Sequence, residues 1–319
     1  MFPFVIITHE LPKDWLAPLE NRVQMLVGPR EPPGFAPILL EKLPEVGGIL
    51  SLLTDRIDEN ILSQAGNLKV VSNMAVGVDN IDLQACQRHG VRVGNTPGVL
   101  TEGTADLTMA LLLSIARRLP EASCDAREGR WSTWSPASWL GADLNEAVLG
   151  IVGLGKIGQA VAHRARGFGM RLIYTDSVRK PDLEDKLGIE FVSFDNLLLQ
   201  SDFVTLHCPL LPETRGLINE ASLSKMKSSS ILINAARGPV VDSEALYRAL
   251  KEGRIAAAAL DVTDPEPLPP SHPLYTLKNC LIVPHIGSAT VKTRKKMAEL
   301  ACLNLLAGIE GKPLIHQVV

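Results

Sequence analysis

The sequence predicts an α/β protein with two domains, each built on a parallel β-sheet. Short apolar runs recur along the chain with helically spaced stretches between them, which is typical of buried parallel strands. A length of 319 residues favours about two domains. Many of the later runs end in a glycine turn, an acid, an arginine or a histidine. Because ligands bind beyond the carboxyl ends of such strands, the pattern favours an enzyme.

The first domain is expected to be the smaller α/β unit. Its strands are predicted at residues 4–8, 46–53, 68–73 and 91–93, with helices over 39–43, 57–65 and 81–88. The sequence Asn-Thr-Pro-Gly at 95–98 then breaks regular structure. We therefore expect the chain to cross into the second domain near that point.

A long helix is predicted over residues 101–118. Thr101 is expected to cap it, and Glu102 and Asp106 place negative charge in its early turns, where that charge suits the helix dipole.

The segment 129–144 carries three of the chain's four tryptophans, at positions 131, 134 and 139, together with Pro136 and several serines. This composition predicts an extended surface segment. Clustered tryptophans outside a regular element favour burial against a partner, and a second subunit is a good candidate.

The second domain is expected to hold the larger, doubly wound sheet. Its strands are predicted at 147–152, 171–175, 203–206, 231–234, 256–260 and 281–284. A last amphipathic helix over 290–309 has no strand after it, so we expect it to return to the first domain. The predicted division is 1–99 with 287–319 for the first domain and 100–286 for the second.

Composition excludes several classes of protein. The net charge is −3 and no long run of Lys and Arg is present, which argues against nucleic acid as a partner. No apolar stretch approaches the length of a membrane span, and the first residues lack the basic start of a signal peptide. Five scattered cysteines, an odd number, favour reduced thiols and a cytoplasmic location.

A Gly-x-Gly-x-x-Gly motif, Gly153-Leu154-Gly155-Lys156-Ile157-Gly158, joins the first strand of the second domain to a predicted helix over 157–166. Such glycines allow a tight turn, close approach of the backbone to a pyrophosphate, and close helix–strand packing. The helix N-terminus offers free N–H groups to the anion. Because a strand, a helix and a later acid all agree with it, the motif predicts a dinucleotide site.

Asp176 is that acid, and it ends the next strand. A carboxylate at this point binds the adenosine ribose hydroxyls, which favours NAD(H), because a 2′-phosphate would face a like charge. Arg179 and Lys180 follow closely and could bind such a phosphate, so NADP(H) stays open.

Arg237, Glu266 and His285 are the candidate catalytic residues. Arg237 follows a buried strand, where a guanidinium can bind a carboxylate through two parallel hydrogen bonds. His285 also follows a strand, and histidine is the usual acid–base group near neutral pH. Glu266, between two prolines, could stabilise the charged imidazole and orient its ring. His207 could serve packing or a hydrogen bond to the cofactor, and no metal site is expected.

Together these motifs resemble the D-isomer-specific 2-hydroxyacid dehydrogenases over essentially the whole chain. The matching segments are the glycine motif, Asn-Ala-Ala-Arg-Gly at 234–238, Asp-Val at 261–262 leading to Glu-Pro at 266–267, and Pro-His-Ile-Gly-Ser-Ala at 284–289. Within the family, the segment 73–82 resembles the substrate loop of glyoxylate/hydroxypyruvate reductases, and 131–140 resembles their tryptophan arm. Asp176 departs from the many reductases of that branch that prefer NADP and lack an acid there.

The resemblance implies a Rossmann-type cofactor domain, a flavodoxin-like substrate domain, and a cleft between them that closes on the substrate. It implies hydride transfer from NAD(P)H to a small 2-oxo acid, which gives glycolate from glyoxylate or D-glycerate from hydroxypyruvate. His285 would donate the proton, paired with Glu266. Arg237 would bind the substrate carboxylate and polarise the keto oxygen.

Further residues acquire expected roles from the same resemblance. Substrate contacts are implied for the backbone N–H groups of Val76 and Gly77 and for Leu53, Ser288, Arg294 and Trp139, the last reaching the site of a partner subunit in a homodimer. Cofactor contacts are expected from Thr104, His207, Pro209, Thr214, Ala235, Ala236, Arg237, Asp261, His285 and Gly287, with Asp261 near the nicotinamide amide.

Two alternatives stay open. Some family members act chiefly as NADH-sensing transcriptional corepressors and keep the Arg-Glu-His set, so that set does not exclude an interaction protein. Another possibility is a different D-2-hydroxyacid dehydrogenase, or a phosphonate or formate dehydrogenase. Glu266 favours a hydroxyacid as the substrate, because the position that matches Glu266 resembles a Gln in the formate enzymes.

Overall fold

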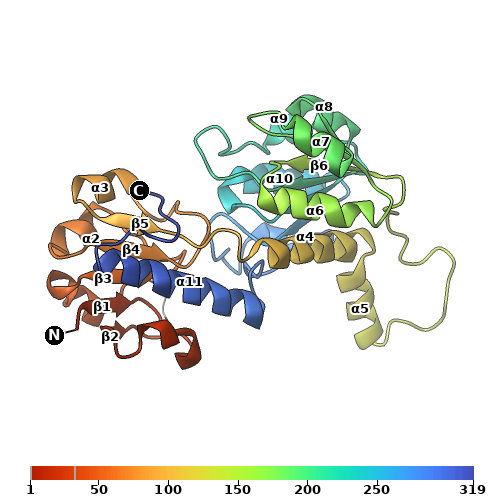
Figure 1. Ribbon diagram of the computed structural model, residues 1–319. Helices are drawn as coiled ribbons and strands as arrows, with labels where there is room; N and C mark the ends of the chain where they lie inside the picture. The colour runs from red at the N-terminus through yellow and green to blue at the C-terminus, as the bar shows by residue number, and fades with distance from the viewer. Residues whose placement is uncertain (1, 32–33) are drawn as a thin grey trace. The chain divides into compact units, whose positions relative to one another are not determined.

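The structure is a computed structural model that describes residues 2–31 and 34–319. It divides into two compact units (Figure 1), unit 1 with Met1–Leu100 and Ala289–Val319, and unit 2 with Thr101–Ser288. Each unit holds one β-sheet, and every pair of neighbouring named strands runs parallel. The predicted α/β class with two parallel sheets is confirmed.

Unit 1 has a five-stranded sheet in the order β2-β1-β3-β4-β5, the flavodoxin-like order. The strands are β1 Phe4–Ile7, β2 Gln24–Val27, β3 Gly48–Ser51, β4 Val70–Asn73 and β5 Arg92–Gly94. The helices are α1 Pro37–Leu40, α2 Glu59–Gln64, α3 Leu83–Arg88 and α11 Val291–Ile309, with 3-10 turns at Lys13–Trp15, Ala17–Leu19 and Leu43–Glu45. The sequence did not predict β2, an edge strand that is partly exposed and has only three apolar residues in a row.

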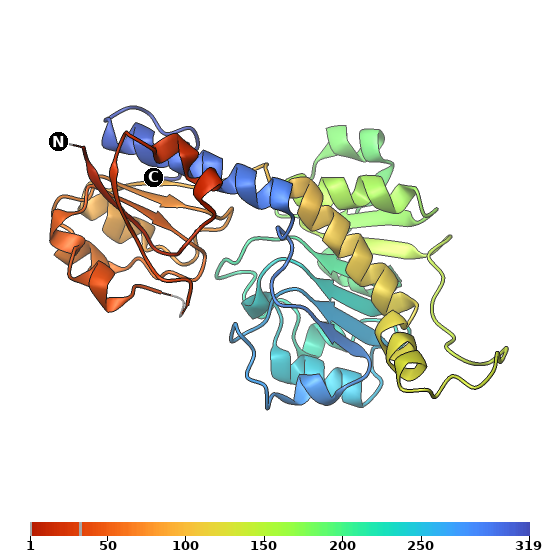
Figure 2. The ribbon, with the colours of Figure 1, turned by 90° about the horizontal axis from the view of Figure 1, so that it is seen from below.

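The C-terminal helix α11 completes the core of unit 1 (Figure 2) and packs on β3, β4 and β5. Its N-cap is Thr290, whose hydroxyl accepts a hydrogen bond from the N–H of Thr293. The chain then turns back, and the Gly94–Gln317 bridge adds the last residues to the edge of the sheet beside β5. The end of the chain therefore stabilises the same sheet as its beginning.

Unit 2 has a seven-stranded sheet in the order β12-β11-β10-β9-β6-β7-β8. The strands are β6 Val148–Val152, β7 Arg171–Thr175, β8 Ile189–Phe191, β9 Phe203–Leu206, β10 Ile231–Asn234, β11 Ala257–Leu260 and β12 Cys280–Ile282. The helices are α4 Thr101–Ala116, α5 Leu119–Arg127, α6 Lys156–Arg166, α7 Pro181–Leu187, α8 Phe194–Gln200, α9 Glu220–Leu223 and α10 Ser243–Lys251, with 3-10 turns at Gly238–Val240 and Pro273–Thr276. The edge strand β8 was not predicted.

This order is the doubly wound arrangement of dinucleotide-binding sheets. The chain moves outward in one direction from β6 through β7 to β8, and in the other from β9 through β10 and β11 to β12. The direction reverses between the neighbours β6 and β9, and a crevice for a ligand forms at such a switch point.

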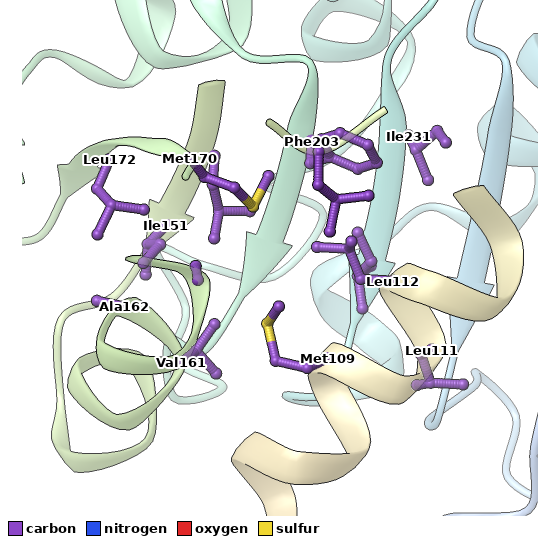
Figure 3. Close-up of a cluster of buried hydrophobic side chains, with 14 of the residues drawn as sticks. Met109, Leu111, Leu112, Ile151, Val161, Ala162, Met170, Leu172, Phe203 and Ile231 are labelled. Atoms are coloured by element: carbon purple, nitrogen blue, oxygen red, sulfur yellow. The ribbon is translucent and has the colours of Figure 1, made fainter. Parts of the chain in front are cut away.

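Helix α4 is buried under the sheet of unit 2, beside α6 (Figure 1). Its Met109 and Leu112 belong to the same apolar cluster as Ile151 of β6, Val161 of α6 and Phe203 of β9 (Figure 3). This packing holds α6, and with it the glycine turn, against the sheet. The prediction for Thr101 was wrong, because Thr101 is the first residue of α4 and does not cap it.

The tryptophan segment forms no helix or strand and loops away from the sheet of unit 2 (Figure 1). The side chains of Trp131 and Trp134 are 71% and 79% exposed. Trp139 is 36% exposed and lies against the Arg118 guanidinium, which is 5.2 Å from its ring centre. The predicted extended surface segment is therefore confirmed. Across the described ranges, no helix is both long enough and apolar enough to cross a bilayer.

Candidate active site

The glycine turn lies at the switch point of unit 2. Gly153 has a φ of +93°, a conformation that side chains disfavour, and a Cβ there would lie 2.8 Å from the backbone nitrogen of Cys208, which follows β9. A Cβ on Gly158 would lie 2.2 Å from the carbonyl oxygen of Gly153. Both positions therefore need glycine to bring α6 close to the ends of β6 and β9.

The N-terminus of α6 is open for an anion. Its N-cap, Gly155, has no side chain that could occupy the first N–H groups, and a Cβ added there would meet no atom within 4 Å. Lys156 and Ile157 start the helix, so their N–H groups have no intrahelical partner. This geometry fits the pyrophosphate of a dinucleotide.

Asp176 follows β7 and lies beside the glycine turn. Its Oδ2 accepts hydrogen bonds from the Leu154 N–H at 2.8 Å and the Lys180 ammonium at 2.6 Å, and its Oδ1 accepts one from the Ser177 N–H at 2.8 Å. Burial alone would raise the pKa of Asp176, but the hydrogen bonds from Lys180 and Leu154 lower it. The carboxylate is therefore charged at neutral pH and held in place.

The two basic residues of this loop differ in their contacts. Arg179 is engaged by Glu184 through two hydrogen bonds of 2.9 and 2.8 Å. Lys180 donates to Asp176 and, at 2.9 Å, to the carbonyl oxygen of Leu154. Of the two cations, only Lys180 thus lies against the glycine turn.

His207 follows β9 at the same switch point. Its Nε2 pairs with the Thr205 hydroxyl at 2.8 Å, and its Nδ1 is buried with no hydrogen-bond partner among the described residues. Burial lowers the pKa of His207 to about 3, so the ring is neutral near pH 7. A neutral ring with an unused nitrogen fits a hydrogen bond to a cofactor better than proton transfer.

The loop after His207 is closed by Thr214. Its hydroxyl donates to the carbonyl oxygen of Pro209 at 2.6 Å and accepts from the N–H of Leu211 at 2.8 Å. The expected cofactor contacts Pro209 and Thr214 therefore belong to one compact turn beyond the end of β9.

Arg237 follows β10, and the Asn234 side chain shapes the turn that carries it. The Asn234 oxygen accepts from the Ala236 N–H, and its amide donates to the carbonyl oxygen of Arg237, both at 3.0 Å. The next residue, Gly238, packs so closely on the following loop that a Cβ would lie 1.8 Å from the carbonyl oxygen of Thr263. The turn of Ala235, Ala236 and Arg237 is thereby fixed beside the loop that carries Glu266.

His285 and Glu266 form a direct pair. The Nδ1 of His285 lies 2.5 Å from Oε1 of Glu266, and both side chains are partly exposed. His285 has a φ of +51°, which is unusual for a residue other than glycine. The other ring nitrogen, Nε2, faces away from this pair and can exchange a proton with a bound molecule.

Asp261 supports the turn that carries His285. This buried carboxylate directly follows β11 and accepts hydrogen bonds from the N–H groups of Ile286 at 2.6 Å and Gly287 at 2.9 Å. Burial raises the pKa of Asp261, and these N–H groups oppose that effect. On the other side, the Thr104 hydroxyl donates to the carbonyl oxygen of Gly287 at 3.3 Å. Asp261 and Thr104 thus have a positioning role that the sequence did not predict.

The turn after β4 in unit 1 directs two N–H groups to one side. The carbonyl of Ala75 accepts from the N–H of Thr96, and the carbonyl of Val76 accepts from the Asn95 amide, both at 2.8 Å. In a trans peptide the N–H points opposite to the C=O. The N–H groups of Val76 and Gly77 therefore point away from residues 95–96, and neither has a partner within the described part of the chain.

The remaining expected substrate contacts differ in setting. Leu53, in the loop after β3, is an exposed leucine of unit 1. Ser288 is half-buried at the end of unit 2, and Arg294 is exposed on α11 in unit 1. Within residues 2–31 and 34–319, no three His, Cys, Asp or Glu side chains gather as a metal ion requires.

Sequence reasoning missed the asparagines that shape these loops. Asn234 and Asn73 end buried strands, and Asn95 directly follows one. The sequence signal that could have identified them is an Asn at the end of a strand, where its side chain can hydrogen-bond the backbone of the next turn.

Comparison with known proteins shows the family of the chain. Residues 109–287 match the family described as D-isomer specific 2-hydroxyacid dehydrogenase, NAD binding domain. The chain is 47% identical to a glyoxylate reductase of Korarchaeum cryptofilum over 98% of this chain and 94% of that protein. It is 51% identical to a glyoxylate reductase/hydroxypyruvate reductase of Mus musculus over 84% of this chain and 82% of that protein.

A solved structure similar to this chain contains NADP. It is the NADPH-dependent glyoxylate/hydroxypyruvate reductase of Sinorhizobium meliloti in complex with NADP and malonate, with a TM-score of 0.89 and 30% identity over 100% of this chain and 97% of that chain. From the family match and the identity to both reductases over most of its length, the chain belongs to the D-isomer-specific 2-hydroxyacid dehydrogenases.

Proposed function

We propose that this protein reduces small 2-oxo acids with a nicotinamide cofactor, converting glyoxylate to glycolate and hydroxypyruvate to D-glycerate. The observation that carries the proposal is the His285–Glu266 pair of 2.5 Å at the end of the sheet that holds the glycine turn. Relatives named for these two activities, at 47% and 51% identity, support the choice of substrates.

The bound cofactor would supply the hydride, and the residues of the chain would manage charge and protons. His285 would donate a proton from Nε2 to the developing alkoxide, while Glu266 at Nδ1 stabilises the charged ring. Arg237 would bind the carboxylate of the substrate and polarise its keto oxygen. The N–H groups of Val76 and Gly77, which both point away from residues 95–96, would donate to the substrate carboxylate.

For the cofactor, we propose a preference for NAD(H). A charged Asp176 beside the glycine turn would accept hydrogen bonds from the ribose hydroxyls and would repel a 2′-phosphate. Lys180 partly neutralises Asp176, so NADPH is expected to bind more weakly without being excluded. Arg179 is expected to contribute little, since Glu184 engages it.

The cofactor proposal is tested by comparing Asp176→Ala, Lys180→Ala and Arg179→Ala. Asp176→Ala should weaken NADH binding more than NADPH binding. Lys180→Ala should weaken NADPH more than NADH, and Arg179→Ala should change neither. Fluorescence titration of the bound reduced cofactor gives both dissociation constants. Equal effects of Asp176→Ala on the two cofactors would refute the ribose contact.

We also propose that the protein is a homodimer in the cytoplasm. The exposed rings of Trp131 and Trp134 provide an apolar surface on the tryptophan segment that a second copy could cover. The contact of Trp139 with the partner's site remains a prediction, and its stacking with Arg118 would fix the base of the segment. All five cysteines are free thiols, consistent with a reducing compartment.

The first experiment is a grid of initial rates for NADH and NADPH against glyoxylate, hydroxypyruvate and pyruvate. We expect fast turnover with glyoxylate or hydroxypyruvate, NADH giving the larger kcat/KM. The His285→Asn variant serves as the negative control for contaminating activity. No turnover with any pair, while NADH still binds, would refute the proposed reaction.

A further inference from the structure

The two loops proposed to contact the substrate in unit 1 are neighbours. The loop 52–55 follows β3 and carries Leu53, and the turn 74–79 follows β4 and carries Val76 and Gly77. Since β3 and β4 are paired parallel strands, their carboxyl ends lie side by side. The relative position of these two loops therefore sets the distance between the Leu53 side chain and the N–H groups of Val76 and Gly77.

Asn80 connects the two loops. Its side-chain amide donates to the backbone carbonyl oxygens of Asp55 at 2.8 Å and Leu52 at 3.1 Å. Its backbone carbonyl oxygen accepts a hydrogen bond from the Ile57 N–H at 3.0 Å. The loop with Leu53 is therefore bonded to Asn80 on both sides of Leu53.

Asn80 also reaches the turn with the N–H donors. Its side-chain oxygen accepts from the Asn73 amide at 3.1 Å, and that same amide donates to the carbonyl oxygen of Gly77 at 3.0 Å. Ser51, at the end of β3, donates to the Asn73 oxygen at 3.1 Å. The two asparagines thus form a continuous polar connection from loop 52–55 to Gly77.

The far side of loop 52–55 is held by a buried carboxylate. Asp55 is fully buried, and its Oδ2 accepts from the Leu52 N–H at 2.7 Å and from the Thr8 hydroxyl at the end of β1. Both the N–H and the C=O of Leu52 are therefore engaged, by Asp55 and Asn80 respectively. With its neighbour fixed in this way, Leu53 has a defined position although its own side chain is exposed.

We propose that Asn80 is a positioning residue that sets the distance between Leu53 and the N–H groups of Val76 and Gly77, and so determines which 2-oxo acids are accepted. Besides the carboxylate, the carbonyl carbon carries a hydrogen in glyoxylate, a methyl group in pyruvate and a hydroxymethyl group in hydroxypyruvate. A displaced Leu53 loop therefore affects the larger acids more than glyoxylate. This inference rests on the proposed function, because it assumes that both loops contact the substrate.

The test compares Asn80→Asp and Asn80→Ser with a matched control, Asn67→Asp. Asn80→Asp keeps the size but replaces the amide donor to Leu52 and Asp55 with an acceptor. Asn80→Ser replaces the amide with a shorter hydroxyl group and adds no charge. Asn67 is also in unit 1 and donates to a backbone carbonyl, that of Pro44 at 2.7 Å, away from both loops. For each variant, kcat and KM are measured with the three acids, together with the NADH dissociation constant and the Tm.

Both Asn80 variants should raise the KM for hydroxypyruvate about tenfold, the effect expected from losing one or two such hydrogen bonds. The KM for glyoxylate should change less, so the ratio of kcat/KM between the two acids shifts. NADH binding, which involves unit 2, should not change, and Asn67→Asp should behave as wild type. If the Asn80 variants are less stable, assays at a lower temperature, where they stay folded, should show the same shift in the ratio of kcat/KM.

A lower Tm with an unchanged substrate ratio in both Asn80 variants would show a structural role only and overturn the proposal. The same ratio shift in Asn67→Asp would overturn it as well. Failure of the wild-type protein to reduce any of the three acids would refute the proposed function and this inference with it. Activity of the wild type together with wild-type ratios in the variants would refute the positioning role alone.

Discussion

At the scale of single residues, His285 combines an unusual backbone with a direct carboxylate partner. Its φ of +51° is maintained by Asp261, which accepts the next two backbone N–H groups. Asparagine tolerates this backbone region better than most residues. His285→Asn should therefore preserve the turn while removing the proton donor.

We expect His285→Asn to lower kcat by roughly 10²–10⁴-fold, the usual contribution of a general acid. NADH binding should stay close to that of wild type. The exposed His163→Asn on α6 is the control, and it should retain full turnover. Steady-state rates and a cofactor titration check the prediction, and near-normal turnover of His285→Asn would contradict the assignment.

Glu266→Gln tests the charge of the partner at nearly constant shape. The imidazole of His285 loses the carboxylate that orients its ring, so kcat should fall while NADH binding stays close to that of wild type. The measurement is kcat with glyoxylate and NADH together with a cofactor titration, with Glu244→Gln on α10 as the control. If kcat of Glu266→Gln equals that of wild type, Glu266 has no part in the proton transfer.

His207 should make stability depend on pH. Burial lowers its pKa from 6.5 to about 3 in the folded protein, so below pH 6.5 the unfolded chain binds a proton that the folded chain does not. The free energy of unfolding should therefore decrease as the pH falls from 6.5 toward 3. Urea denaturation at several pH values should show a weaker decrease for His207→Gln than for wild type or His163→Asn. The same pH dependence of the free energy of unfolding in wild type and both variants would contradict this role of His207.

At the scale of elements, the central strands and the edge strands β5 and β12 were predictable, whereas the edge strands β2 and β8 were not. Buried runs such as Ile231–Asn234 are apolar on both faces, so the sequence marks them clearly. The edge strands β2 and β8 have partly exposed faces and only three or four residues. Their pairing with a neighbour, which a local pattern does not contain, makes them strands.

The contact of α6 with the glycine turn gives a prediction at this scale. A Cβ on Gly158 would lie 2.2 Å from the Gly153 carbonyl oxygen, so Gly158→Ala must push the helix away from the turn. We expect a loss of about 1–3 kcal/mol in stability, typical of overpacking, and weaker NADH binding. Gly66→Ala, where a Cβ meets no neighbour, is the control for urea denaturation and cofactor titration. Unchanged NADH affinity would argue against a cofactor at this turn.

At the scale of the whole molecule, the tryptophan segment leads to a test of assembly. Trp131 and Trp134 are the most exposed large aromatic side chains among the described residues. If a second copy covers them, Trp131→Ser with Trp134→Ser should shift the protein from dimer toward monomer in sedimentation velocity. The control is Tyr275→Ser, an exposed aromatic of unit 2 outside the segment. A dimer of unchanged affinity would exclude this surface as the interface.

The sequence by itself determined the α/β class, the central strands and the glycine turn, and it predicted Arg237, Glu266 and His285 as the candidate catalytic residues. Those features depend on local patterns: apolar runs, glycine spacing, and polar groups placed directly after strands. Only the tertiary structure decided that Asp261 supports the His285 turn, that Glu184 engages Arg179, and that Asn80 joins two loops. These contacts join residues that become hydrogen-bond partners only when the folded backbone brings them together. A polar residue in the sequence shows that a donor or acceptor is present, but it does not show which group it will bond to.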